Sequence, residues 1–120
     1  MRIVEVHLQS PDLARQREFY ARVFGLAPLP GPAGELRFAI GASQLIFRPA
    51  PAGPPGLYHF AFNIPANQFA AAAAWARPRL DLIADADGAD TFHFASWDAH
   101  ALYFADPDGN IVELIARHGL

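Results

Sequence analysis

The sequence predicts an α+β fold built from two halves of similar order, and three observations support this. Each half opens with a strand that carries one histidine, His7 in the first and His59 in the second. A helix follows each of these strands, and three shorter strand candidates follow each helix. The Pro- and Gly-rich segment 49–56 (PAPAGPPG) separates the halves. Such a repeat indicates duplication around a pseudo-twofold axis, with two four-stranded sheets facing each other across a cleft.

The length of 120 residues fits a single domain, residues 1–120. Within it we expect a first module at about residues 1–50, a linker at 49–56 and a second module at about residues 57–118. Hydrophobic residues make up 52% of the chain and charged residues 18%, which is typical of a globular protein.

Composition excludes several chemistries. All nine basic residues are arginine and the chain has no cysteine, so Schiff-base lysines, P-loops, thiol nucleophiles and disulfides are excluded. The formal net charge of −3 leaves no basic surplus to neutralise phosphates, and we expect no nucleic-acid partner. Any metal site must therefore be built from His, Asp and Glu.

The start of the chain favours a cytoplasmic location. It runs directly into a strand-like segment at residues 3–8, without the basic region and apolar core of a signal peptide. The longest apolar tract, residues 69–76, is too short to span a bilayer, so we expect no membrane partner.

In the first half, alternation over residues 3–9 predicts a strand with His7 on its less apolar face. Ser10-Pro11-Asp12 then predicts a helix that begins with Ser10 as N-cap, and Gly25 suits the position just after its last turn. Shorter strands are predicted at residues 36–40 and 44–48. A further strand near 26–29 is weakened by prolines.

In the second half, alternation over residues 57–64 predicts a strand that carries His59, and Pro78 ends a helix at 68–76. Residues 80–84 are either a short strand or a helix end. The sequence Asp-Pro-Asp-Gly at 106–109 predicts a turn without the spaced acids of a calcium loop. The remaining strands are predicted at 91–95, 101–105 and 111–116.

Glu113 lies between two isoleucines on one face of the last strand. A carboxylate is costly in an apolar strand unless it is paired or ligated, and Arg117 or Arg48 are alternative partners. Together, His7, His59 and Glu113 supply two imidazoles and one carboxylate. This set suits one divalent ion of Fe, Mn, Zn or Ni and leaves positions open for substrate or water, so we predict these residues as metal ligands.

The segment from Tyr103 to Leu114 (YFADPDGNIVEL) resembles the C-terminal signature of the vicinal oxygen chelate (VOC) superfamily. This group includes glyoxalase I, extradiol dioxygenases, fosfomycin-resistance thiol transferases and bleomycin-binding proteins. The segments VHL at 6–8, SPDL at 10–13 and YHFAF at 58–62 match as well, so the resemblance covers essentially the whole chain.

The resemblance implies two βαβββ modules that form a cupped mixed sheet, the glyoxalase/bleomycin resistance/dioxygenase fold. It also implies that His7, His59 and Glu113 occupy the metal-ligand positions of the family. Single-domain members are usually homodimers, and in some of them the two modules of one site come from different chains. We therefore expect a homodimer that binds a small-molecule substrate.

Two further residues point to a dioxygenase-like reaction. Tyr103 lies ten residues before Glu113, where ring-cleaving members carry a tyrosine, and His93 lies upstream at a spacing one residue longer than their histidine. We predict both as catalytic, with Tyr103 hydrogen-bonding a bound oxygen and His93 acting as acid or base. The substrate would be a small oxygen-rich or aromatic molecule.

Three alternatives remain open. A fosfomycin-type thiol transferase fits the length, but it uses a lysine near His93. A glyoxalase I needs a further acidic ligand at residues 44–48, where Gln44 is the only carbonyl-type group. A metal-free, bleomycin-like binding protein would use an apolar pocket instead. The aromatic candidates for its lining are Phe38, Phe47, Trp75, Trp97 and Tyr103.

Overall fold

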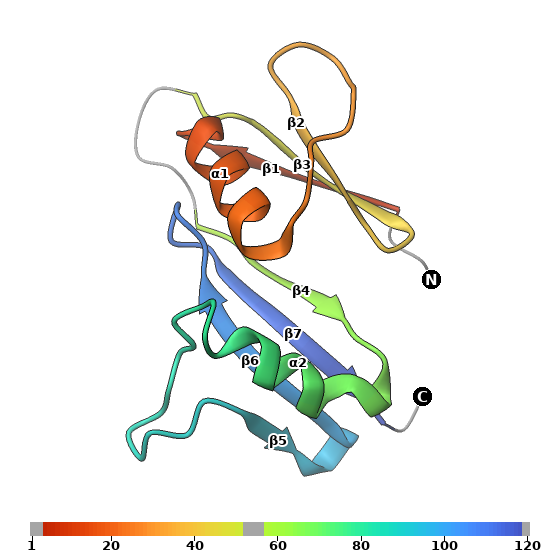
Figure 1. Cartoon of the computed structure of the whole chain (residues 1–120), viewed down its shortest axis with the longest axis vertical. Coiled ribbons are helices and arrows are strands. Elements are labelled where there is room, and N and C mark those ends of the chain that lie inside the picture. The colour runs from red at the N-terminus through yellow and green to blue at the C-terminus, as the bar shows by residue number, and fades with distance from the viewer. Residues whose placement is uncertain (1–3, 52–56, 119–120) are drawn as a thin grey trace. The chain divides into compact units, whose positions relative to one another are not determined.

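The computed structural model describes residues 4–51 and 57–118, so the predicted strand residue Ile3 and linker residues 52–56 lie outside the described residues. The chain divides into two compact units, Met1–Tyr58 and His59–Leu120. Each unit contains its own sheet and its own α-helix (Figure 1). None of the helices in these ranges is long and apolar enough to cross a membrane.

The first unit contains β1 (Glu5–Ser10), α1 (Leu13–Phe24), β2 (Leu36–Ile40) and β3 (Ser43–Pro49). Its sheet has the order β1-β3-β2, in which β1 is parallel and β2 antiparallel to β3. This sheet therefore has three strands, and the prediction of four was wrong. Leu29 donates one backbone hydrogen bond to Arg37, at 2.8 Å, but the prolines on either side of it have no N–H with which to extend a ladder.

The ends of α1 follow the sequence, with one correction. Asp12, rather than Ser10, is the N-cap, and its carboxylate accepts a hydrogen bond from the backbone N–H of Arg15 at 3.1 Å. The Ser10 hydroxyl instead accepts from the N–H of Asp12 at 3.2 Å. Gly25 takes the left-handed conformation, with φ of 66°, and donates to the carbonyl of Ala21, so the predicted C-terminal position is confirmed.

An aromatic core joins α1 to one face of the first sheet. The ring of Tyr20 lies 5.1 Å from that of Phe38 and 6.0 Å from that of Phe47, and all three side chains are fully buried. Leu8 is in register with Phe47 and therefore faces the helix. Because side chains alternate along a strand, His7 points to the opposite, helix-free face.

The described part of the second unit contains one α-helix, two short 3₁₀ helices and four strands. They are β4 (His59–Asn63), η1 (Ala66–Gln68), α2 (Phe69–Ala76), β5 (Phe92–Phe94), η2 (Ala95–Trp97), β6 (Ala99–Ala105) and β7 (Ile111–Arg117). The sheet has the order β4-β7-β6-β5, in which β4 is parallel to β7 and the other pairs are antiparallel. Residues 80–84, predicted as either a short strand or a helix end, contribute a single bridge between Leu82 and Phe104.

The turn between β6 and β7 forms at the predicted Asp-Pro-Asp-Gly sequence. Gly109, with φ of 86°, donates its N–H to the carbonyl of Asp106 at 3.0 Å. The buried Asp106 carboxylate accepts from the N–H groups of Asp108 and Asn110, each at 3.0 Å, and from the Asn110 side chain at 2.8 Å. This turn fixes the register in which Tyr103 lies directly opposite Glu113.

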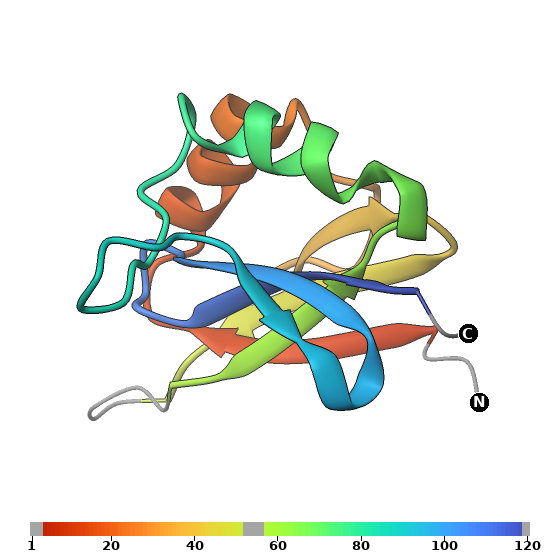
Figure 2. The same cartoon turned by 90° about the horizontal axis from the view of Figure 1, so that it is seen from below.

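The two faces of the second sheet have different surroundings. The ring of Phe69, at the start of α2, lies 5.4 Å from that of His100, so α2 lies on the His100 face (Figure 2). Leu102 and Phe104 share that face by alternation and are fully buried. Glu113 and Tyr103 lie on the other, helix-free face.

Candidate functional site

Glu113 and His59 meet on the helix-free face of the second sheet. Glu113 is central in β7, and His59 is the first residue of the neighbouring strand β4, in register with Ile111. The His59 Nε2 atom lies 3.0 Å from Glu113 Oε1. The Glu113 side chain is only 11% exposed, whereas His59 is 59% exposed. The predicted alternatives for Glu113, a pairing with Arg117 or Arg48, are therefore replaced by a pairing with an imidazole.

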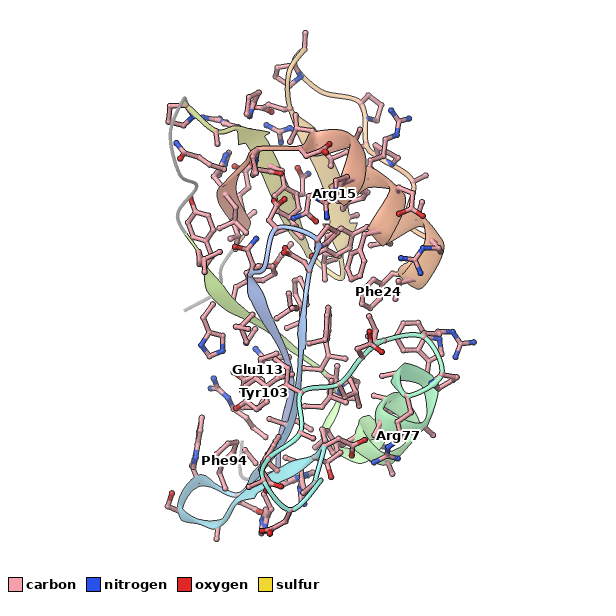
Figure 3. The ribbon with its side chains drawn as sticks, turned by 90° about the vertical axis from the view of Figure 1, so that its left-hand side faces the viewer. Arg15, Phe24, Arg77, Phe94, Tyr103 and Glu113 are labelled. Carbon is pink, nitrogen blue, oxygen red and sulfur yellow. The ribbon has the colours of Figure 1, made fainter. Side chains whose placement is uncertain are left out.

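Tyr103 lies beside this pair on β6, and Figure 3 shows its side chain next to that of Glu113. Its ring centroid is 6.1 Å from that of His59. Burial of the phenol raises the pKa of Tyr103 above its ordinary value of 10.0, and the negative charge of Glu113 and a hydrogen bond to that carboxylate raise it further. Tyr103 is therefore protonated at neutral pH and can act as a hydrogen-bond donor.

Replacing Glu113 with glutamine is expected to lower the pKa of Tyr103 towards its ordinary value, because the neighbouring negative charge is removed. Phenolate absorbance in an alkaline titration measures this, and the absence of Lys and Cys leaves tyrosines as the side chains that titrate between about pH 9 and 12. Tyr103→Phe identifies the Tyr103 component of the curve. A component that titrates at the same pH in both wild type and Glu113→Gln would contradict the coupling.

The raised pKa also has a consequence for stability. Because the folded state holds the Tyr103 proton more tightly than the unfolded state does, this stabilisation is complete below about pH 10 and is lost as pH rises through the raised pKa. Tyr103→Phe should therefore flatten the decline of stability in alkali.

An apolar cluster packs against Tyr103 on the same face of the sheet. Ala99, Ala101 and Ile115 are buried together, and Phe94 and Tyr103 pack against them. The ring of Phe92 lies 5.7 Å from that of Tyr103. Polar donor and acceptor atoms therefore sit at the edge of an aromatic surface, which suits a ligand with both oxygen atoms and an apolar body.

His93 does not join this group. It is in register with His100 on β6, three positions from Tyr103, so alternation places it on the opposite, α2 face of the sheet. Its ring stacks on that of His100, with centroids 4.4 Å apart and planes at 13°. Tyr103 and His93, which were predicted to act together in catalysis, therefore lie on opposite faces of the sheet. The register between β5 and β6 decides the face of His93, and the number of residues between His93 and Tyr103 does not reveal it.

His7 has its own polar neighbours in the first unit. Its Nε2 atom lies 2.9 Å from Glu5 Oε2. The hydrogen bond with His7 is the largest cause that lowers the pKa of Glu5. Burial opposes it, and the charges of His7 and Arg37 lower the pKa further. Gln44 is in register with Glu5 and so lies on the His7 face, where its side-chain carbonyl accepts from Arg37 at 2.9 Å.

Sequence reasoning missed the charged network on this face. Arg37 Nε donates to Glu35 at 2.9 Å, and Arg48 Nε donates to the other Glu35 oxygen at 3.0 Å. Burial alone would raise the pKa of Glu35, but hydrogen bonds and positive charge from the two arginines outweigh it and lower the pKa. The alternation of Arg37 with apolar neighbours in β2 was the available signal, but only the pairing of β2 with β3 shows its partners.

Within the described part of either unit, no three His, Asp or Glu side chains form a preassembled metal cluster. The second unit thus contributes two of the predicted ligands, and His7 belongs to the first unit. Phe38 and Phe47, which were considered as pocket lining, are fully buried core residues against α1. Trp97 is 49% exposed, with the Arg117 guanidinium 5.7 Å from its ring.

Solved structures share this fold over nearly the whole chain. The lactoylglutathione lyase from Agrobacterium tumefaciens is 25% identical, with a TM-score of 0.72 over 96% of this chain and 92% of its own. A glyoxalase/bleomycin resistance protein/dioxygenase from Nocardioides is 20% identical, with a TM-score of 0.72 over 100% of this chain and 86% of its own. Oxidase ChaP-H1 is 24% identical, with a TM-score of 0.71 over 98% and 96%. No family model and no curated protein matches the sequence.

The protein thus has the glyoxalase/bleomycin resistance/dioxygenase fold, and the fold class and the resemblance predicted from the sequence are confirmed. Its structural neighbours include a lyase, an oxidase and a protein described as a glyoxalase/dioxygenase. Because one fold carries several reactions, the activity must be argued from the residues of the site.

Proposed function

We propose that the protein is a divalent-metal-dependent enzyme of the glyoxalase/dioxygenase type that acts on a small oxygen-rich or aromatic molecule. The observation that carries this proposal is the 3.0 Å approach of His59 Nε2 to Glu113 Oε1, beside the protonated hydroxyl of Tyr103. The aromatic surface next to these groups supports a substrate with an apolar body.

The donor set fits a divalent ion. Two adjacent ligand atoms at about 2.0–2.2 Å from one ion lie about 2.8–3.6 Å apart at octahedral or tetrahedral angles. The separation of 3.0 Å between His59 Nε2 and Glu113 Oε1 falls in this range. His59 and Glu113 would hold Fe, Mn, Zn or Ni together with a second imidazole from His7. These three ligands would leave coordination positions open for substrate oxygens. His7 of the same chain or of a second copy in a homodimer would serve equally.

The side chains have separable roles in this proposal. The bound ion would supply Lewis-acid stabilisation of charge on two neighbouring substrate oxygens. Tyr103, whose hydroxyl donates to Glu113 in the structure, would turn this one proton to a substrate oxygen when the carboxylate binds the ion. The partly buried rings of Phe92 and Phe94, which lie on the same face as Tyr103, hold the body of the substrate and exclude water.

A metal-free binding protein is the second candidate, and one observation favours it. The Glu113 carboxylate already has two partners, His59 and Tyr103, so its burial does not require an ion. In that case the same face would bind an apolar ligand by its aromatic side chains alone.

Elemental analysis of untagged protein, purified without chelator, distinguishes the two. We expect the wild type to hold about one equivalent of Fe, Mn, Zn or Ni per chain more than Glu113→Gln and His59→Ala, which remove one donor each. Asp90→Asn is a matched control, because this carboxylate pairs with Arg77 at the surface. Equal metal content in the wild type and in both ligand variants after reconstitution would reject the enzyme in favour of the binding protein.

A further inference from the structure

Three of the five histidines gather on the α2 face of the second sheet, opposite the Glu113 face. They are His93 on β5, His100 on β6 and His118 just after β7. The Nδ1 atom of His100 lies 2.8 Å from Nε2 of His118, and their rings meet edge to face with centroids 4.9 Å apart. One nitrogen of each imidazole thus faces the other, at a distance that a shared metal ion could bridge.

The backbone and the neighbouring rings hold both imidazoles in place. The N–H of His118 donates to the carbonyl of Asp98 at 2.8 Å, which continues the ladder between β6 and β7 by one residue. Asp98 has a positive φ of 49°, which turns the chain from η2 into β6. On the other side, His100 is held between the stacked ring of His93 and the ring of Phe69 at 5.4 Å.

The local charge favours a cation. The Asp98 carboxylate lies 3.8 Å from Nε2 of His93, whose ring stacks on that of His100. Arg117, the arginine next to His118 in sequence, is in register with Ala99 and therefore lies on the opposite face, where it covers Trp97. A positive ion at the pair would therefore have a nearby carboxylate, and the adjacent guanidinium is directed away from it.

We propose that His100 Nδ1 and His118 Nε2 form a binding site for a borderline divalent ion such as Zn²⁺, separate from the Glu113 site. Neutral imidazole suits Zn²⁺, Cu²⁺ and Ni²⁺, whereas Mg²⁺ and Ca²⁺ require oxygen ligands. Two imidazole nitrogens at about 2.05 Å from one ion lie about 2.9 Å apart at 90° and about 3.3 Å apart at the tetrahedral angle. The separation of 2.8 Å therefore has to widen by only a few tenths of an ångström on binding. Water molecules complete the coordination.

No net proton loss is needed for this binding. In the absence of an ion, one ring donates its N–H to the other across the 2.8 Å contact. On binding, that proton moves to the other nitrogen of the same ring, since a neutral imidazole carries its single proton on either nitrogen. Both facing nitrogens then present lone pairs to the ion.

Calorimetric titration of Zn²⁺ into untagged, chelator-treated protein tests the proposal. His118→Gln is expected to bind one equivalent fewer than the wild type, and the double variant Glu113→Gln/His118→Gln one fewer than Glu113→Gln. His118 is exposed and lies beyond the end of β7, so its replacement should leave the fold intact. Arg117→Gln is the matched control. It should bind as much Zn²⁺ as the wild type, because Arg117 is next to His118 in sequence but its guanidinium lies over Trp97 on the opposite face.

Nitrogen chemical shifts of the imidazoles provide a second measurement in the wild type. Zn²⁺ should shift His100 Nδ1 and His118 Nε2 and leave the other nitrogen of each ring protonated. The same Zn²⁺ stoichiometry in His118→Gln and wild type, or no change at these two nitrogens, would overturn the proposal. If the Glu113 site binds no metal, Glu113→Gln would bind as much Zn²⁺ as the wild type, whereas His118→Gln would still bind one equivalent fewer. Failure of the proposed function is therefore distinguishable from failure of this inference.

Discussion

Replacing Asp106 with alanine is expected to lower the free energy of unfolding by about 3 kcal/mol. The Asp106 side chain is 5% exposed and accepts hydrogen bonds from two backbone N–H groups and from the Asn110 amide. Alanine would leave these donors, in a largely buried turn, without their acceptor, and an unsatisfied buried donor costs more than its hydrogen bond contributes. Urea unfolding followed by tryptophan fluorescence measures the change.

Asp85 offers a control with the same pattern in a different environment. Its Oδ1 atom accepts from the N–H of Asp87 at 2.9 Å and from that of Ala89 at 3.0 Å, two and four residues on, as Asp106 does. Asp85 is exposed, so water can replace the lost acceptor, and Asp85→Ala should have a much smaller effect. Equal losses of stability in the two variants would show that burial of the Asp106 turn is not the cause.

The Asp106 variant also bears on function. The turn holds β6 and β7 in the register that places Tyr103 opposite Glu113. Loosening it should therefore reduce metal retention at Glu113 more than Asp85→Ala does, even at temperatures where both variants are folded.

Phe47→Ala is expected to lower the free energy of unfolding by about 3–5 kcal/mol, which is a large fraction of the stability of a small protein. Phe47 is fully buried in β3, the central strand of the first sheet, and its ring lies 6.0 Å from that of Tyr20 on α1. Removing the ring leaves a cavity between helix and sheet that a single domain of this size cannot close. Denaturant unfolding measures the loss.

Two neighbouring substitutions calibrate this result. Phe47→Leu retains most of the apolar volume and should cost much less than Phe47→Ala. Arg48→Ala, at the next position, removes a surface side chain that pairs with Glu35 and should cost little. A loss in Phe47→Ala no greater than in Arg48→Ala would contradict the assignment of Phe47 to the core.

Much of the fold was predictable because its signals are local. Alternation identified β1 and β4, and Gly25 and the Asp-Pro-Asp-Gly sequence identified the end of α1 and the last turn. These patterns depend on neighbours within a few residues, so they can be recognised without knowledge of the tertiary structure. Errors arose where local alternatives compete closely, as at the N-cap, which is Asp12 and not Ser10.

The candidate site was only partly predictable. The composition, without Lys or Cys, restricted any metal site to His, Asp and Glu, and the position of Glu113 in an apolar strand indicated that it needs a partner. The metal-ligand role of His7, His59 and Glu113 remains a proposal. The direction of His93 depended on how β5 pairs with β6, and a shift of one residue in such a register reverses the face of every side chain.

The sequence by itself determined the order of strands and helices, the separation of apolar and polar faces, and the chemistry available to a site. Only the tertiary structure decided which side chains meet. His59 and Glu113 are 54 residues apart, and His100 and His118 are 18 apart, yet each pair lies within hydrogen-bonding distance. The physical reason is that alternation is set by the geometry of a single strand, whereas these contacts depend on which strands pair and in what register.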